Sequence, residues 1–91
     1  MLRKKISEKD IEKLFEVVLE LKNINDCKAL FSDLCTDKEI EQMAQRIKAA
    51  KLLIEGKTYN EVIAETDISS ATLSRVSRCV QYGEGYSKFI K

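Results

Sequence analysis

The sequence predicts an all-α fold, a helical bundle with a helix-turn-helix, for three reasons. Proline is absent and only three glycines occur among 91 residues, so little in the chain interrupts helices. Apolar residues recur at the three- and four-residue spacing of a helix. At several places a serine or threonine is followed three residues later by aspartate or glutamate, a pairing typical of helix starts. A chain of this length predicts one domain, residues 1–91.

Two amphipathic helices are predicted in the first third of the chain. Ser7 and Asp10 mark the start of a helix over residues 8–22, and Asp26 caps a second, shorter helix. The apolar stripe of the first helix comprises Ile11, Leu14, Phe15, Val18 and Leu21, and that of the second comprises Cys27, Leu30, Phe31 and Leu34. Neither helix can hide its stripe from water alone. We therefore expect them to pack on the rest of the chain or on a second copy of it.

The longest predicted helix covers residues 37–55 and serves as the central scaffold. Thr36 and Glu39 form a capping box at its start, and Gly56 ends it at a position that accepts positive φ. Its apolar positions are Ile40, Met43, Ala44, Ile47, Ala50 and Ile54, widened by Leu52 and Leu53. This width predicts contacts on more than one side. At the end of the chain, residues 87–91 are expected to form a last helical turn, with Phe89 and Ile90 folded back on the core.

Residues 58–82 have the pattern of a helix-turn-helix. Thr58 and Glu61 form a capping box for a short first helix, which should stop near Glu65. Asp67 tolerates the left-handed backbone that such a turn needs, and Ile68 then fills the angle between the helices. Ser69 or Ser70 is expected to cap a second helix over about residues 70–82.

The second helix of the motif divides into an apolar and a polar face. Leu73, Val76 and Val80 share one face, while no acidic residue occurs from Ile68 to Gly83. The opposite face comprises Ser70, Ala71, Ser74, Arg75, Arg78 and Gln81. Small, hydroxylated and basic side chains suit base edges and phosphates. We interpret this face as a DNA-reading surface; an ordinary solvated face is the alternative.

The predicted DNA contacts fall into two groups. Base edges are assigned to Ser70, Ala71, Ser74 and Arg78, and phosphates to Lys57, Thr58, Asn60, Thr72 and Arg75, with Ser69 included as a cap at the same end of the helix. The basic sequence Arg3-Lys4-Lys5 either reaches DNA as an arm or is merely a mobile terminus.

Charge and composition narrow the function further. The net charge is only +1, but residues 1–45 carry eight Lys/Arg and ten Asp/Glu, whereas residues 46–91 carry eight and five. The half with the motif is thus the positive half, as phosphate contact requires. There is no long apolar run and no signal-peptide pattern, so a cytoplasmic protein with no membrane partner is expected.

The sequence also argues against metal binding and catalysis. Histidine is absent, and Cys27, Cys35 and Cys79 lack a Cys-x-x-Cys spacing, so no metal site is expected and the thiols should be reduced and mostly buried. A cysteine nucleophile would lack its usual base, and the carboxylates fall on capping and solvent-facing positions. We expect no enzyme activity.

Several motifs together resemble those of the Trp-repressor-like family, closest to its YerC/YecD-type subgroup. They are Thr36-Asp-Lys-Glu39, Arg46, Gly56 and Ala71-Thr-Leu-Ser-Arg75, and the resemblance covers about residues 10–90. It implies an intertwined all-α homodimer in which helices within about residues 8–55 form the dimer. It also implies a transcription regulator, acting as a repressor by occlusion, whose two reading helices enter successive major grooves.

The resemblance further implies a pocket for tryptophan between the long helix and the reading helix. Thr36, Arg46 and Arg75 match the family pattern, but Val76 stands where the family has a glycine that leaves space for the indole, and Cys79 stands where it has a serine. Because a branched side chain would overpack such a slot, we predict that tryptophan is not the effector and that no cofactor is bound. Arg46 and Arg75 would then either bind another small carboxylate or phosphate, or form ion pairs with acidic residues such as Glu65.

One further hypothesis remains open at this point. Near-neutral net charge also fits a helical protein-interaction module whose helix-turn-helix no longer contacts DNA. The two hypotheses differ in salt dependence, because phosphate contacts weaken steeply as salt rises.

Overall fold

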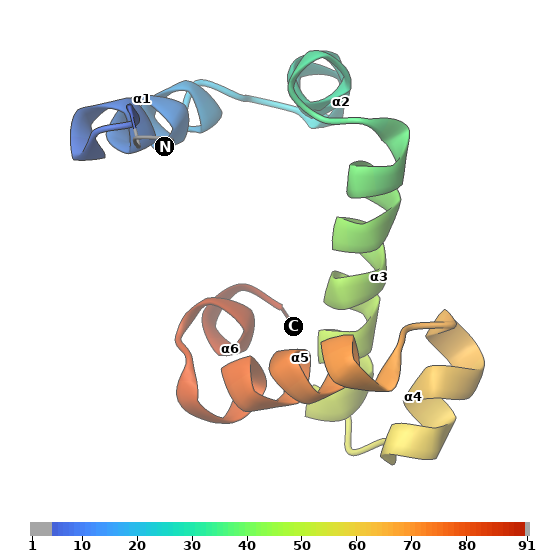
Figure 1. Ribbon diagram of the computed structural model, residues 1–91. Helices are drawn as coiled ribbons and strands as arrows, with labels where there is room; N and C mark the ends of the chain where they lie inside the picture. The colour runs from blue at the N-terminus through green and yellow to red at the C-terminus, as the bar shows by residue number, and fades with distance from the viewer. Residues whose placement is uncertain (1–4, 91) are drawn as a thin grey trace. The chain divides into compact units, whose positions relative to one another are not determined.

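The computed structural model describes residues 5–90, and within this range the chain forms six helices and no strand (Figure 1). The helices are α1 Glu8–Val18, α2 Ile24–Leu34, α3 Asp37–Ile54, α4 Tyr59–Thr66, α5 Ser70–Tyr82 and α6 Gly85–Phe89. The predicted all-α class is confirmed. The chain divides into two compact units, with α1 and α2 in residues 1–34 and α3 to α6 in residues 35–91. No helix among the described residues is long and apolar enough to cross a membrane.

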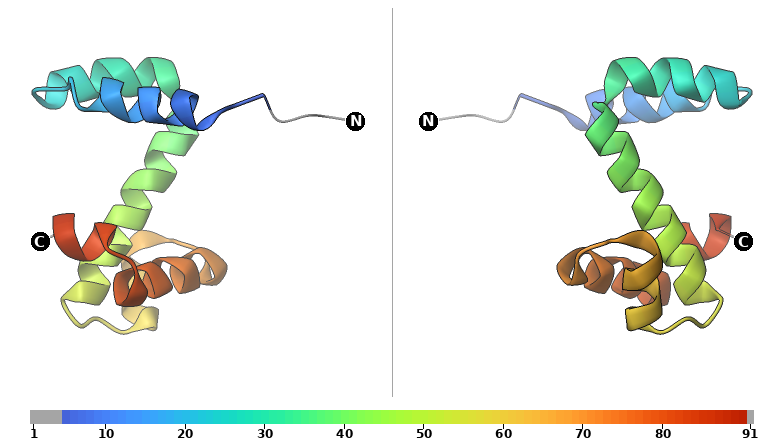
Figure 2. Two further views of the ribbon diagram at one scale, coloured as in Figure 1. Left: turned by 90° about the vertical axis from the view of Figure 1, so that its left-hand side faces the viewer. Right: turned by 90° about the vertical axis from the view of Figure 1, so that its right-hand side faces the viewer.

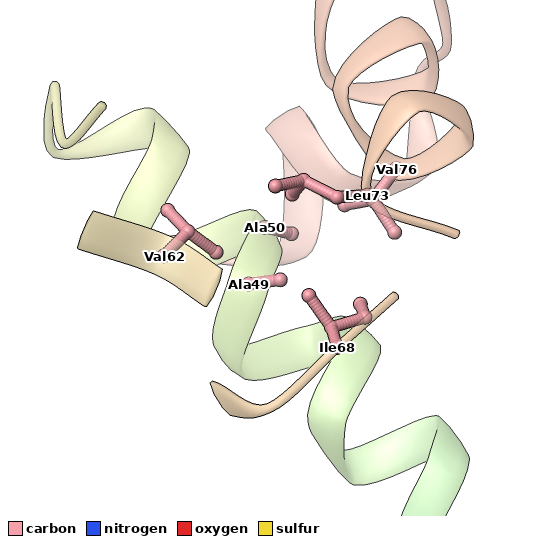
Figure 3. Close-up of a cluster of buried hydrophobic side chains, with 6 residues drawn as sticks. All are labelled: Ala49, Ala50, Val62, Ile68, Leu73 and Val76. Atoms are coloured by element: carbon pink, nitrogen blue, oxygen red, sulfur yellow. The ribbon is translucent and has the colours of Figure 1, made fainter. Parts of the chain in front are cut away.

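The second unit is built around α3. Both views of Figure 2 show α4 and α5 against the carboxyl-terminal half of α3, where α3 contacts each of them and α6. Figure 3 shows the six buried side chains that join these helices, namely Ala49, Ala50, Val62, Ile68, Leu73 and Val76. The two alanines place little bulk on α3, so the helices of the motif can approach it closely. This confirms α3 as the scaffold of the motif.

The buried face of α3 differs from the predicted stripe. Ala49 was not in that stripe, yet it is fully buried, whereas Ile47 remains 49% exposed and Ile54 41% exposed. The reason is that α4 and α5 cover the side of α3 that bears Ala49, Ala50 and Leu53. Part of the predicted apolar stripe therefore stays uncovered within one chain.

Four predicted helix boundaries are confirmed, at the starts of α1, α3 and α4 and at the end of α3. In α3, the N–H of Thr36 donates to Oε1 of Glu39 at 2.8 Å, and the N–H of Glu39 donates to Oγ1 of Thr36 at 3.1 Å. Equivalent capping boxes form at the start of α1, between Ser7 and Asp10, and at the start of α4, between Thr58 and Glu61. Gly56 has φ 94°, a left-handed backbone that favours glycine. These four sites therefore lie where the sequence predicted them.

In the first unit, two predicted helix boundaries are wrong. α1 stops at Val18 instead of residue 22, because the N–H groups of Glu20 and Leu21 donate to carbonyls three residues back and tighten the chain into a turn. α2 starts at Ile24, and its cap is Asn23, whose Oδ1 accepts the N–H of Asp26 at 2.8 Å. The carboxylate of Asp26 instead accepts the N–H of Lys22 at 3.0 Å. Asp26 is thus the acidic partner in this start, not the cap.

Other expectations about burial also need correction. The thiols are not mostly buried, since Cys27 is exposed and Cys35 and Cys79 are only partly covered. Phe89 does not fold onto the core and is 73% exposed; Tyr86 of α6 packs there instead. The helix that bears them starts at Gly85, two residues earlier than predicted. Of the basic arm, Arg3 and Lys4 lie outside the described residues.

Candidate nucleic-acid interface

The turn between α4 and α5 is held by one buried hydroxyl. Oγ1 of Thr66 donates to the carbonyl of Val62 at 2.7 Å and accepts the N–H of Ile68 at 3.3 Å. Between them Asp67 takes the predicted left-handed conformation at φ 61°, and Ile68 is buried as predicted. These bonds set the direction in which α5 leaves the turn.

Ser69, the first of the two predicted alternatives, caps α5. Its Oγ accepts the N–H of Thr72 at 3.2 Å and also donates to Oγ1 of Thr72 at 3.0 Å. The hydroxyls of Ser69 and Thr72 are therefore engaged with each other. Ser70 lies one residue further along and is exposed, with no acidic residue in the first turn of the helix. Ser70 is thus better placed than its neighbours to offer a free hydroxyl to a partner.

The two faces of α5 are separated as predicted. Leu73 and Val76 are buried on α3, and Ser77 is buried beside them. The predicted outer residues are all exposed, namely Ser70, Ala71, Ser74, Arg75, Arg78 and Gln81. Within residues 5–90, neither Arg75 nor Arg78 forms an ion pair or a hydrogen bond through its side chain. Both guanidinium groups are free to bind anions or base edges.

α4 is tied to the scaffold and capped at its start. Nζ of Lys48 in α3 donates to the carbonyl of Glu65 at 3.3 Å, at the end of α4 where carbonyls lack helical partners. At the other end, the backbone N–H of Thr58 donates to Oε1 of Glu61 at 2.8 Å. That bond, with the Thr58 hydroxyl and the charge of Lys57, lowers the pKa of Glu61 below its ordinary value of 4.5. Thr58 is thus occupied with capping.

Asn60 and Lys57 are the other two residues near the start of α4 that were predicted to contact phosphates. Both are exposed near the start of the helix. The side chain of Asn60 has no partner in residues 5–90, and that of Lys57 has no ion pair or hydrogen bond there, although its charge acts on Glu61. Their amide and ammonium groups are therefore available to an external ligand.

The predicted effector residues do not converge within one chain. Thr36 caps α3 about 15 Å along the helix from Arg46. Val76 is buried in the core, Arg75 is exposed, and Cys79 lines an apolar hollow of about 480 Å³ beside α6. The ion pair with Glu65, considered as an alternative for the two arginines, is absent from residues 5–90.

Arg46 instead lines a polar hollow of about 370 Å³ between α3 and the turn of the motif. The other lining residues are Gln42, Gln45, Asp67, Ile68, Ser69 and Thr72. The two glutamines were not predicted as site residues. With Arg46 they occupy positions i, i+3 and i+4 of the predicted long helix, and this polar patch was the signal that could have identified them.

Lys48 was also missed, because a hydrogen bond between residues 17 positions apart leaves no local pattern. The described part of the chain holds no group of three or more His, Cys, Asp or Glu that could bind a metal ion.

Comparison with known proteins agrees with this geometry. Residues 2–91 match the family described as Trp repressor protein. The chain is 46% identical over 79 residues to the uncharacterized protein YerC of Bacillus subtilis (strain 168), covering 87% of this chain and 76% of that protein.

Two crystal structures have the same fold. One is a TrpR-like protein from Eubacterium eligens ATCC 27750, with 39% identity, a TM-score of 0.85 and coverage of 92% of this chain and 88% of that one. The other is a candidate Trp repressor from Staphylococcus aureus, with 38% identity, a TM-score of 0.83 and coverage of 89% and 82%. The family and the fold together indicate a helix-turn-helix regulator that binds DNA. The chain belongs to the Trp repressor family.

Proposed function

We propose that the chain is a sequence-specific transcription regulator that binds DNA as a homodimer and represses by occluding its site. The observation that carries this proposal is the outer face of α5. It is exposed, contains two arginines without partners in residues 5–90, and lies on a helix with no acidic residue. Such a face matches the negative charge of DNA and suits a major groove, which is wide enough to admit an α-helix.

The contacts follow from the position of each side chain along the motif. In a helix-turn-helix the amino-terminal part of the second helix meets the base edges. Ser70, Ala71 and Ser74 lie in that part and are small enough for close approach, and Arg78 can fork onto a guanine. Arg75, Asn60 and Lys57 are exposed around them and suit phosphates.

The homodimer is proposed from the first unit. No residue of α1 or α2 is buried, and both helices expose large apolar side chains, including Leu14 at 39%, Phe15 at 59% and Ile24 at 73%. A second copy of the chain would cover these side chains and display α5 twice on a two-fold axis. Two copies of α5 then read two half-sites about one helical turn apart. In this proposal the regulator acts in the cytoplasm.

The test starts with selection of bound sequences from a random duplex pool. Arg78→Ala should then weaken binding of the selected duplex by roughly 1–3 kcal/mol, about fivefold to 150-fold, while binding of unrelated duplexes changes little. Arg78→Lys is the matched control, because it keeps the charge but loses the planar fork. It should retain the salt dependence and still lose discrimination. Equal discrimination by all three proteins would remove Arg78 from base reading.

A protein-interaction module remains the second candidate, favoured by the near-neutral net charge of +1. Salt separates the two functions. A DNA-binding dimer should bind duplex tightly at low salt and lose affinity steeply toward physiological salt. Absence of binding to any duplex at low salt would favour the interaction module.

We also propose that tryptophan is not the effector. Val76 is 1% exposed and packs within the core beside Ala49 and Ala50, so its methyl groups occupy the space that a ring would need. Admitting an indole would require the valine to move, at a cost of about 1–3 kcal/mol. Calorimetric titration with tryptophan should show no binding in the micromolar range. Micromolar binding would contradict this proposal.

A further inference from the structure

Tyr82 is the last residue of α5, and its side chain is 81% exposed. At 3.6 residues per turn, Tyr82 lies about 180° around the helix from Leu73, which is fully buried. It lies within about 20° of Arg75 and of Ala71. Because Tyr82 lies on the side of α5 that faces away from the core, packing within this unit does not account for an aromatic residue at this position.

The chain after Tyr82 leaves this side of the helix uncovered. The N–H of Gly83 donates to the carbonyl of Cys79 at 2.8 Å and closes the last turn of α5. The backbone then becomes extended at Gly83, and α6 packs on the core through Tyr86. The apolar hollow beside α6 is lined by Cys79, Gly83, Tyr86 and their neighbours, but not by Tyr82.

We infer that Tyr82 is a further DNA-contacting residue, whose phenol hydroxyl donates to a backbone phosphate at the outer end of each half-site. This inference rests on the proposed function. Charge complementarity identifies the partner, because the line that Tyr82 shares with Arg75 and Arg78 carries two cations and no acid. Tyrosine is also among the residues that commonly bind DNA phosphates.

Geometry separates this contact from base reading. Ala71 and Tyr82 are eleven residues apart, which is roughly 16 Å along the helix, or about five base-pair steps. The amino-terminal end of the helix enters the groove, and a straight helix cannot follow the curved groove over that length. The far end of α5 therefore leaves the base edges and meets the sugar-phosphate backbone. Tyr82 fixes the depth and tilt of α5 without reading sequence.

Tyr82→Phe tests the inference, because it removes the hydroxyl alone. With the full-length chain, it should weaken binding of the selected duplex and of an unrelated duplex by the same factor, about threefold to tenfold. Because the phenol is uncharged, the slope of affinity against salt should stay that of the parent. Tyr86→Phe is the matched control, since it makes the same change on the core side of the chain and should bind both duplexes as the parent does.

Four results would overturn the inference. Unchanged binding by Tyr82→Phe would remove Tyr82 from the contact surface. A loss confined to the selected duplex would make it a base reader. A shift in the monomer–dimer equilibrium, measured by sedimentation, would place it in a protein interface. If the parent itself binds no duplex at low salt, the proposed function fails and the inference fails with it, whereas the first three results leave the proposed function standing.

Discussion

The two units of the chain differ in how far they bury their apolar side chains. In residues 35–91, four helices share a core whose largest members, Leu73, Val62 and Val76, are less than 2% exposed. In the first unit, neither α1 nor α2 contains a buried residue, although both have clear apolar faces. Amphipathic pattern alone therefore does not tell whether a helix is packed within its own chain. The difference shows that the second unit has a core of its own, and it is the basis of the proposal that a second copy of the chain covers the first unit.

The largest expected effect is on the stability of the proposed homodimer. Phe15→Glu should weaken the proposed homodimer by about 3–6 kcal/mol, because burying a phenylalanine contributes about 1.5–3 kcal/mol and a two-fold interface contains the residue twice. Analytical ultracentrifugation would measure the change. Lys9→Glu, on the polar side of α1, is the control and should stay dimeric. A Phe15→Glu protein that remains as dimeric as the parent would argue against α1 as an interface.

The next effect tests whether the second unit is self-supporting. In the monomeric Phe15→Glu background, Leu73→Ala should lower the free energy of unfolding by about 2–5 kcal/mol, because it opens a cavity between α3 and α5. Leu14→Ala in the same background should change it by less than about 0.5 kcal/mol. Urea denaturation followed by circular dichroism measures both. Similar losses in the free energy of unfolding for Leu73→Ala and Leu14→Ala would contradict the proposed difference between the two units.

A smaller effect concerns the turn before α5. Thr66→Val keeps the shape of the side chain but removes the hydroxyl that joins Val62 to Ile68. It should cost about 1–3 kcal/mol of stability, because the buried N–H of Ile68 loses its partner. Ser70→Ala, an exposed change four residues after Thr66, should leave the thermal midpoint almost unchanged. Equal midpoints for all three proteins would show that the hydroxyl does not hold the turn.

The smallest effect is a pH dependence at the start of α4. The pKa of Glu61 is lowered in the folded chain, mainly by the hydrogen bond from the Thr58 backbone, so its contribution is present above the unfolded value of 4.5 and is lost as pH falls through the folded value. Glu61→Gln should therefore show a smaller drop in thermal midpoint than the parent between about pH 5 and pH 2. Parallel curves would mean that the charge of the Glu61 carboxylate adds nothing measurable to the capping box. Above pH 5 the parent should be slightly the more stable.

Most local features of the second unit were predictable because they depend on residues a few positions apart. The capping boxes at Thr36 and Thr58, the left-handed Asp67 and the limits of α5 at residues 70 and 82 were all predicted and found. In each case the competing conformations differ by a hydrogen bond between near neighbours. The exposure of the polar face of α5 followed from helical periodicity in the same way.

Features that depend on distant segments were predicted less well. Ala49 was missed as a core residue, and Ile47 was expected to be covered but is half-exposed. Which side of α3 is buried depends on where α4 and α5 dock, and no spacing within α3 encodes that. The hollow beside Arg46 has the same origin, because its walls come from residues 42–46 and 67–72.

The sequence by itself determined where helices begin and end in the motif, which face of α5 is polar, and which family the chain belongs to. Tertiary structure decided which side of α3 became the core and that Tyr82 stays exposed at the end of α5. The physical reason is range. Caps and periodicity involve residues within one or two turns of a helix, whereas burial depends on segments that meet only when the whole unit has folded.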